Sequence, residues 1–154
     1  MKFDIYTDGS CKGNPGPGGW AFVIVHRGNL LIKQSSSLRN TTNNKAELLA
    51  IINALLGLSK LKQSKQVTLV IYTDSKYVAN AFNLKWIEAW LAKNFDNVKN
   101  ERHWRLLIKL ISNFKHVKFV WVKGHSDNEF NNIVDELACN ASKLAYNLNK
   151  QSKK

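Results

Sequence analysis

Two segments of this 154-residue sequence end in the same Tyr-Thr-Asp triplet, and each places a carboxylate where it could do chemistry. Asp8 ends an alternating segment of strand formers at 3–8, and Asp74 follows an apolar, β-branched segment at 67–73. Neighbouring strands lie about 4.8 Å apart, so two parallel strands would set these carboxylates side by side. Ligands usually bind at the carboxyl ends of such strands, and the triplets therefore predict a ligand site.

Two further acids stand among apolar neighbours, where a solvated surface acid is less expected. Glu47 lies near the start of a predicted helix at 45–58, and Asp135 lies on a predicted helix at 128–147. Clustered carboxylates raise one another's pKa unless a cation compensates them, and such oxygen ligands suit Mg²⁺ or Mn²⁺ rather than zinc. Only 11 of the 154 residues are acidic, so this joint placement favours a metal site.

Each acid taken alone also has an ordinary structural interpretation. Asp8 precedes Gly9 and could form a turn, and Asp74 could cap a helix that begins at Ser75. Glu47 could be a first-turn acid that the helix dipole favours. The sequence alone leaves these alternatives open.

The loops offer one candidate proton carrier and one misleading motif. His125 follows a predicted strand at 117–122, so it is either a proton shuttle near neutral pH or a surface residue. The glycine-rich loop at 13–19 leads into a strand and lacks the Gly-Lys-Ser/Thr ending, so it is no nucleotide-binding motif. Its backbone could still approach a phosphate or sugar closely.

The order of predicted elements indicates an α/β fold. Three strands come first, and helices then alternate with two more strands; the strands are expected at 3–8, 20–26, 30–37, 67–73 and 117–122. The helices are expected at 45–58, 75–82, 104–114 and 128–147, with a short helix inside 83–103. Long helical crossovers require parallel pairing, so we expect a mixed sheet with helices on both faces. Residues 1–148 should form one domain, followed by a frayed basic tail at 149–154.

Composition narrows the class of protein. The net charge of +12 is typical of proteins that bind polyanions such as nucleic acid, although solubility alone could account for it. Two cysteines are too few for a disulfide scaffold or a paired zinc site. The sequence lacks an apolar run of about 20 residues and a secretory signal, so we expect a cytoplasmic protein without a membrane segment.

Four ordered segments resemble the signatures of the bacterial-type ribonuclease H family, and the match covers nearly the whole chain. These segments are 6–19, 41–48, 73–75 and 121–138. The resemblance implies a mixed five-stranded sheet, its first three strands antiparallel and the other two parallel to the first. It also implies that two Mg²⁺ ions, for which Mn²⁺ could substitute, are held by four acids: Asp8, Glu47, Asp74 and Asp135.

The same resemblance implies a reaction and a partner. The expected activity is hydrolysis of the RNA strand of RNA–DNA hybrids by a monomer, leaving 5′-phosphate and 3′-hydroxyl ends, with His125 assisting proton transfer or product release. Thr42 and Asn43, at a helix N-terminus, would hold a DNA phosphate through free backbone N–H groups. The residues implied to face the RNA strand are Gly9, Cys11, Asn14 and Asn44. Contacts of this kind carry little base information, so weak sequence preference is expected.

Residues 83–103, the handle segment, resemble the basic element with which the family packs on the DNA strand. Trp86 and Trp90 would make the contact, unless they belong to the core. The segment departs from the family pattern because it contains four basic residues and three acidic ones, which leaves its net charge close to zero. Lys76 stands where a glutamine is common, which adds a charge near the hybrid. Asn132 stands where many members carry a further acid.

Two other functions fit the same fold. A non-catalytic nucleic-acid-binding module would explain the net charge of +12 but gains nothing from clustered acids near phosphates. A polynucleotidyl transferase that acts on DNA is the third alternative, which the RNA-facing loop and the single-domain length disfavour.

Overall fold

The computed structural model describes residues 1–124 and 127–152, and its centre is a five-stranded sheet. The strands are β1 (Lys2–Cys11), β2 (Gly16–His26), β3 (Asn29–Thr41), β4 (Thr68–Thr73) and β5 (His116–Trp121). Their order across the sheet is β3-β2-β1-β4-β5. The first three strands are antiparallel, and β4 and β5 run parallel to β1. The predicted mixed sheet is confirmed.

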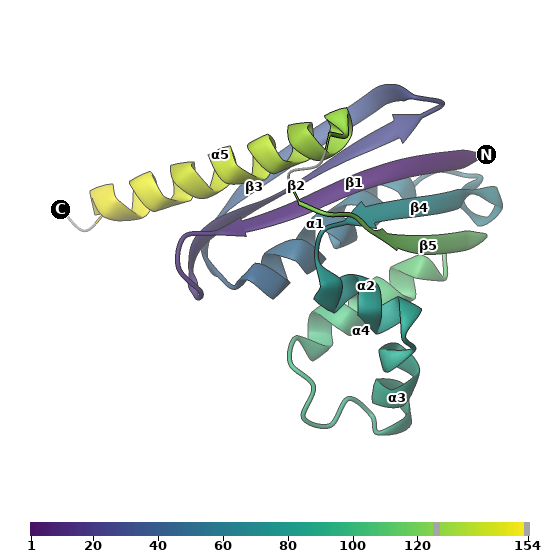
Figure 1. Ribbon diagram of the computed structural model, residues 1–154. Helices are drawn as coiled ribbons and strands as arrows, with labels where there is room; N and C mark the ends of the chain where they lie inside the picture. Colours follow the sequence, from purple (N-terminus) through teal and green to yellow (C-terminus); the bar gives the residue numbers. More distant parts are fainter. Residues whose placement is uncertain (125–126, 153–154) are drawn as a thin grey trace.

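Helices cover both faces of this sheet, as Figure 1 shows. They are α1 (Asn43–Leu58), the 3₁₀ turn η1 (Ser64–Gln66), α2 (Lys76–Asn83), α3 (Trp86–Ala92), α4 (Glu101–Ile111) and α5 (Glu129–Ser152). The long helix α5 lies across β1, β2 and β3 on one face, whereas α1 packs on the other face with α4 against it. None of the described helices is long and apolar enough to span a membrane.

The alternation of β1 assigns its side chains to two cores. Phe3 and Ile5 belong to the larger core, which contains the buried faces of α1 and α4, while Tyr6 belongs to the smaller core beneath α5. Because strand side chains alternate with a period of two, Asp8 points to the same face as Tyr6. Gly9 then falls on the face that carries α1. The strand therefore sets Asp8 toward α5 and leaves its other face open to α1.

The C-terminal segment differs from expectation. The last helix runs to Ser152, so residues 149–152 continue α5 instead of forming a frayed tail. Its final turns are tied to the sheet, because Asn149 Nδ2 donates to the backbone carbonyl of Arg39 on β3 at 2.8 Å. The rest of the predicted tail, 153–154, lies outside the described residues.

Candidate active site

Three carboxylates from three different elements converge at one edge of the fold. One oxygen each from Asp8, Glu47 and Asp74 lies within 4.8 Å of the other two. The parallel register pairs Tyr6 of β1 with Tyr72 of β4. Two residues further along each strand, Asp8 and Asp74 are therefore level with each other. The twin triplets thus become neighbouring carboxylates, as the parallel pairing predicts.

Glu47 reaches the two aspartates because α1 approaches β1 unusually closely. A Cβ atom at position 9 would lie 2.5 Å from the backbone nitrogen of Glu47 and 2.8 Å from the Cβ of Ala46. Only glycine permits this approach. At the start of α1, the Thr42 hydroxyl accepts the N–H of Lys45 at 3.2 Å and fixes where the helix begins. The glycine and the cap together set Glu47 beside Asp8.

The ordinary interpretations of the aspartates do not account for the cluster. Asp74 does not cap α2, because the cap is Ser75, whose hydroxyl accepts the N–H of Val78 at 3.2 Å. Asp8 accepts the N–H of Gly9 at 2.9 Å, yet no turn follows, since β1 continues to Cys11. The first strand is therefore longer than predicted, and Asp8 lies inside it.

The three carboxyl groups of the cluster have raised pKa values, because each is desolvated and lies close to other acids. Asp8 and Glu47 are each only 7% exposed. Burial raises the pKa of Asp8 to about 8, with further contributions from the charges of Asp74 and Asp135. Burial and then the charges of Asp8 and Asp74 raise the pKa of Glu47 well above its ordinary value. The pKa of Asp74 is raised as well, by desolvation of its carboxyl group and by Asp135, although the residue as a whole is exposed.

A divalent cation fits this donor set. Among the described residues, Glu47 Oε2 is buried and has no hydrogen-bond partner, which is costly for a carboxylate oxygen. Asp135, half-buried on α5, lines a cavity of about 30 Å³ with Asp8 and Asp74. All the donors are hard carboxylate oxygens, the type that Mg²⁺ and Mn²⁺ prefer. A cation bound here would neutralise the clustered charge and give the orphaned oxygen a partner.

Comparison with known proteins agrees with this geometry. The RNase H family model matches residues 1–143. The chain belongs to the ribonuclease H family. A curated Ribonuclease H from Caldanaerobacter subterraneus subsp. tengcongensis is 46% identical over 141 residues, which cover 88% of this chain and 87% of the relative. One from Acetivibrio thermocellus is 44% identical over 142 residues, covering 89% and 92%.

Solved ribonuclease H structures share the fold. LC11-RNase H1, crystallised in complex with RNA/DNA hybrid, is 28% identical and superposes with a TM-score of 0.72 over 94% of this chain and 99% of that one. The N-terminal RNase H domain of a Mycobacterium tuberculosis protein is 25% identical and gives a TM-score of 0.75 over 99% of both chains. The similarity therefore extends over nearly the whole chain.

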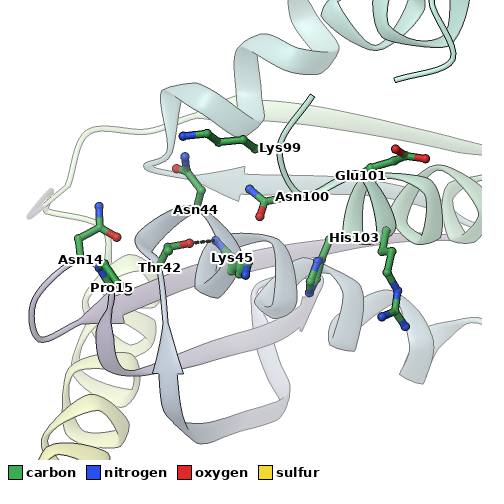
Figure 2. A pocket seen from close by; sticks show the side chains of 10 residues that line it. Asn14, Pro15, Thr42, Asn44, Lys45, Lys99, Asn100, Glu101 and His103 are labelled. Carbon is green, nitrogen blue, oxygen red and sulfur yellow. Dashed lines mark hydrogen bonds between the residues drawn. The ribbon is translucent and has the colours of Figure 1, made fainter. Parts of the chain in front are cut away.

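Beside the carboxylates, a larger cavity of about 800 Å³ opens between the start of α1 and the start of α4. Figure 2 shows three residues of the ribonuclease H signatures on its wall, Asn14, Thr42 and Asn44. The opposite wall comes from the handle segment and the start of α4, and includes Lys99 and Asn100. The family resemblance had assigned the first three residues to substrate, and the structure brings them together.

This cavity also contains cationic residues that the sequence gave no reason to single out. Lys45 from α1 and Lys99 and Arg102 from the handle segment line it, together with Glu101 and His103. Burial lowers the pKa of His103, and the charges of Lys45 and Arg102 lower it further. The only signal in the sequence was a basic residue directly after the Thr-Thr-Asn-Asn segment.

Two of the expected substrate contacts are already engaged within the protein. The N–H of Asn43, expected to be free for a phosphate, donates to Asn14 Oδ1 at 3.1 Å and ties the glycine-rich loop to α1. The Cys11 thiol donates to backbone carbonyls, including that of Gly13, and burial raises its pKa. This N–H and this thiol already donate hydrogen bonds within the protein. Contacts with a substrate at these two positions would therefore come from neighbouring groups.

Lys76 has a partner that the sequence did not reveal. Its ammonium group lies 5.0 Å from the ring centroid of Trp121, the last residue of β5. The indole N–H of Trp121 donates to the backbone carbonyl of Asp74 at 3.0 Å. Trp121 therefore connects a residue of the carboxylate cluster to a predicted substrate residue. Its position at a strand end, just before Val122-Lys123-Gly124, is the signal that could have identified it.

The two handle tryptophans have different environments. Trp86, at the start of α3, is 37% exposed. Trp90 packs edge-on against the buried Trp104, with ring centroids 5.1 Å apart, and also contacts Phe95. The alternative of a core role therefore applies to Trp90, while Trp86 remains available to substrate.

His125 lies outside the described residues. The chain nevertheless brings the preceding residue to the carboxylates, because a Cβ atom at Gly124 would lie 3.4 Å from Asp74 Oδ2. Gly124 also lines the small cavity that contains Asp8 and Asp135.

Proposed function

We propose that this chain is an endonuclease that hydrolyses the RNA strand of RNA–DNA hybrids and requires divalent metal ions. The observation that carries the proposal is the convergence of Asp8, Glu47 and Asp74 within 4.8 Å of one another. Family membership supports the activity, and the similar structure of LC11-RNase H1 bound to RNA/DNA hybrid supports the substrate.

The four acids would hold two Mg²⁺ ions. When bound, the ions supply an activated water and stabilise the oxygen that leaves the scissile phosphate, which yields 5′-phosphate and 3′-hydroxyl ends. Glu47 is fixed by the close contact of Gly9 with α1, and Asp74 by the Trp121 hydrogen bond. The fold thus holds Glu47 and Asp74 in place for metal binding, and Asp135 on α5 would be the fourth acid. Asn132 does not add a further acid, so these four carboxylates would carry the binding.

Substrate contacts would be made in the cavity beside the carboxylates and on the handle segment. The cationic cavity at the start of α1 suits a phosphate of the DNA strand, since Lys45, Lys99 and Arg102 line it. Asn14 and Asn44, on the wall nearer the glycine-rich loop, would recognise the ribose 2′-hydroxyl, the group that distinguishes RNA from DNA. Trp86 would pack against the DNA strand from the handle segment.

His125 would assist proton transfer or product release, because imidazole titrates near neutral pH. His125→Ala should lower kcat more than it raises KM and should flatten the pH profile of kcat. A variant with the same profile as the unmodified enzyme would remove this role. The expected monomer and the cytoplasmic location remain predictions of the sequence.

The test is cleavage of a labelled RNA–DNA duplex with Mg²⁺ or Mn²⁺, before and after chelation. DNA–DNA and RNA–RNA duplexes of the same sequence serve as controls. We expect cleavage of the RNA strand of the hybrid alone, lost on chelation and restored by added metal. Binding of the hybrid without cleavage would identify a non-catalytic module, and cleavage of the DNA duplex would identify a DNA-acting enzyme.

A further inference from the structure

Part of the positive charge of this protein lies far from the carboxylates, in stretches without acids. Two segments carry several lysines and no acid: 59–67, between α1 and β4, and 107–118, across the end of α4 and the first half of β5. Together they contribute six exposed side chains, which we call the lysine surface: Lys60, Lys62, Lys65, Lys109, Lys115 and Lys118. The handle segment, by contrast, is nearly neutral. The question is what these six charges serve.

Direct contacts hold the two segments together. Lys65 Nζ donates to the backbone carbonyl of Ser112 at 2.6 Å, and the N–H of Lys115 donates to the carbonyl of Val67 at 3.0 Å. The register of β4 and β5 places Lys118 beside Val70. The lysines therefore share one end of the molecule, where β4 and β5 begin (Figure 1).

This end is opposite to the active site. The carboxylates lie at the carboxyl end of β4, and the lysine surface surrounds its start. The six residues of β4 span about 20 Å, and even Lys118, level with Val70, lies four residues or about 13 Å along the strand direction from Asp74, so one phosphate at the metal site does not also contact these lysines. The surface must bind a different part of a ligand, or a different ligand.

Acidic groups of the protein do not neutralise the lysine surface. Within residues 1–124 and 127–152, none of its six lysines forms an ion pair. The acid that register places nearest is Asp4, which lies level with Lys118 two strands away and is already paired with Lys2 at 3.7 Å. Six lysines without an ion pair at one end of the molecule create a local field that attracts polyanions.

We propose that the lysine surface is a second nucleic-acid-binding site, which binds the phosphate backbone of single-stranded or duplex nucleic acid flanking the hybrid. Lysines are point charges without the fork geometry of arginine, so they suit binding that ignores sequence. The surface would retain the enzyme near its substrate and supply the attraction that the handle segment lacks. This role rests on the proposed function, because the retained ligand is the nucleic acid that contains the hybrid.

Two of the six lysines also have a structural role in the fold. Lys109 lies in the last turn of α4, where a cation stabilises the helix dipole. Lys65 is engaged with Ser112. The test therefore leaves these two in place and changes Lys60, Lys62 and Lys118, whose side chains form no hydrogen bond or ion pair with the described residues.

The experiment compares the triple variant K60Q/K62Q/K118Q with the matched control K33Q/K143Q/K150Q. The control removes the same net charge from exposed positions on β3 and α5. Substrates are a short blunt hybrid and the same hybrid extended by single-stranded DNA or by duplex DNA. Binding is measured without Mg²⁺ over a range of salt concentrations, and thermal unfolding verifies the fold of both variants.

We expect the triple variant to cleave the short hybrid normally but to bind an extended hybrid about tenfold more weakly, with a salt slope lower by about 2. The control should keep both properties, and the extension that shows the larger loss identifies the favoured form. Equal losses in both variants, or no loss in either, would overturn the proposal. So would weaker binding of polyglutamate with unchanged binding of nucleic acid, which would indicate an acidic protein partner. Cleavage of the short hybrid reports on the proposed function independently.

Discussion

The carboxylate cluster and the handle segment show two different ways in which this sequence specifies a site. The cluster gathers four acids from β1, α1, the end of β4 and α5, and Asp8 and Glu47 at its centre are buried. The handle segment is one continuous stretch, largely exposed, which contains four basic and three acidic residues. Chemistry therefore depends on a few residues held by the whole fold, while binding is distributed over a surface. Substitutions should separate these two regions by the size and the kind of their effects.

The largest effect should come from the centre of the cluster. Asp8→Asn removes a charged metal ligand without changing the size of the side chain, and should lower kcat roughly 10³-fold, as expected for the loss of several kcal/mol of transition-state stabilisation. Hybrid binding should change little, because the handle segment and the cationic cavity remain. Single-turnover cleavage and fluorescence anisotropy measure the two quantities. Retained cleavage would break the distinction between chemistry and binding.

The next effect tests the packing that positions Glu47. Gly9→Ala would force a Cβ against the backbone of Glu47 and Ala46, which should destabilise the fold by about 1–3 kcal/mol and lower activity roughly a hundredfold. Gly57→Ala is the matched control, because a Cβ there has no atom within 4 Å. Because Gly57 lies in the last turn of α1 with a negative φ, alanine there should stabilise the protein by up to about 1 kcal/mol. Equal effects of the two substitutions on activity would contradict the positioning of Glu47 by Gly9.

The raised pKa of Asp8 predicts how stability depends on pH. Between its ordinary value of 3.8 and about 8, the folded protein holds a proton that the unfolded chain has lost. The free energy of unfolding of the metal-free protein should therefore fall as pH rises through this window. Because other groups also titrate, the comparison is with Asp8→Asn, which should be the more stable protein near pH 8. Added Mg²⁺ should raise the melting temperature of the unmodified protein there and have less effect on the variant.

The smallest effects should come from the handle segment, where the two tryptophans differ. Trp86→Ala should raise KM roughly fivefold, equivalent to about 1 kcal/mol, with little change in melting temperature. Trp90→Ala should mainly lower the melting temperature, with a loss of about 2 kcal/mol, because Trp90 packs against Trp104 and Phe95. Steady-state kinetics and thermal unfolding of both variants separate the roles. The reverse pattern would exchange the binding tryptophan and the structural one.

The sequence was sufficient for the order and pairing of the strands and for the convergence of the acids, although β2 and β3 are longer than predicted, because both features leave local signals. Alternating strand formers identify β1, and long crossovers require β4 to lie parallel to it, which brings Asp8 and Asp74 together. The apolar neighbours of Glu47 and Asp135 then single out these two acids, and the family signatures contain both. These inferences need only the order of elements and the periodicity of each strand.

The sequence was not sufficient for features that depend on how elements pack. The close contact of Gly9 with α1 and the Trp121 hydrogen bond to Asp74 join residues 38 and 47 positions apart. The lysine surface likewise joins segments more than 40 positions apart, through the Lys65 contact with Ser112. No local periodicity encodes such contacts. The end of α5 was mispredicted for the same reason, because its final turns are held by β3.

The central claim is that Asp8, Glu47, Asp74 and Asp135 bind divalent metal ions. Anomalous diffraction from crystals soaked in Mn²⁺ tests it most directly, with Asp8→Asn crystals as the comparison. The account predicts anomalous density among these four carboxylates, including a peak beside Glu47 Oε2, and weaker density in the variant. No density at the cluster, or density that the substitution leaves unchanged, would contradict it.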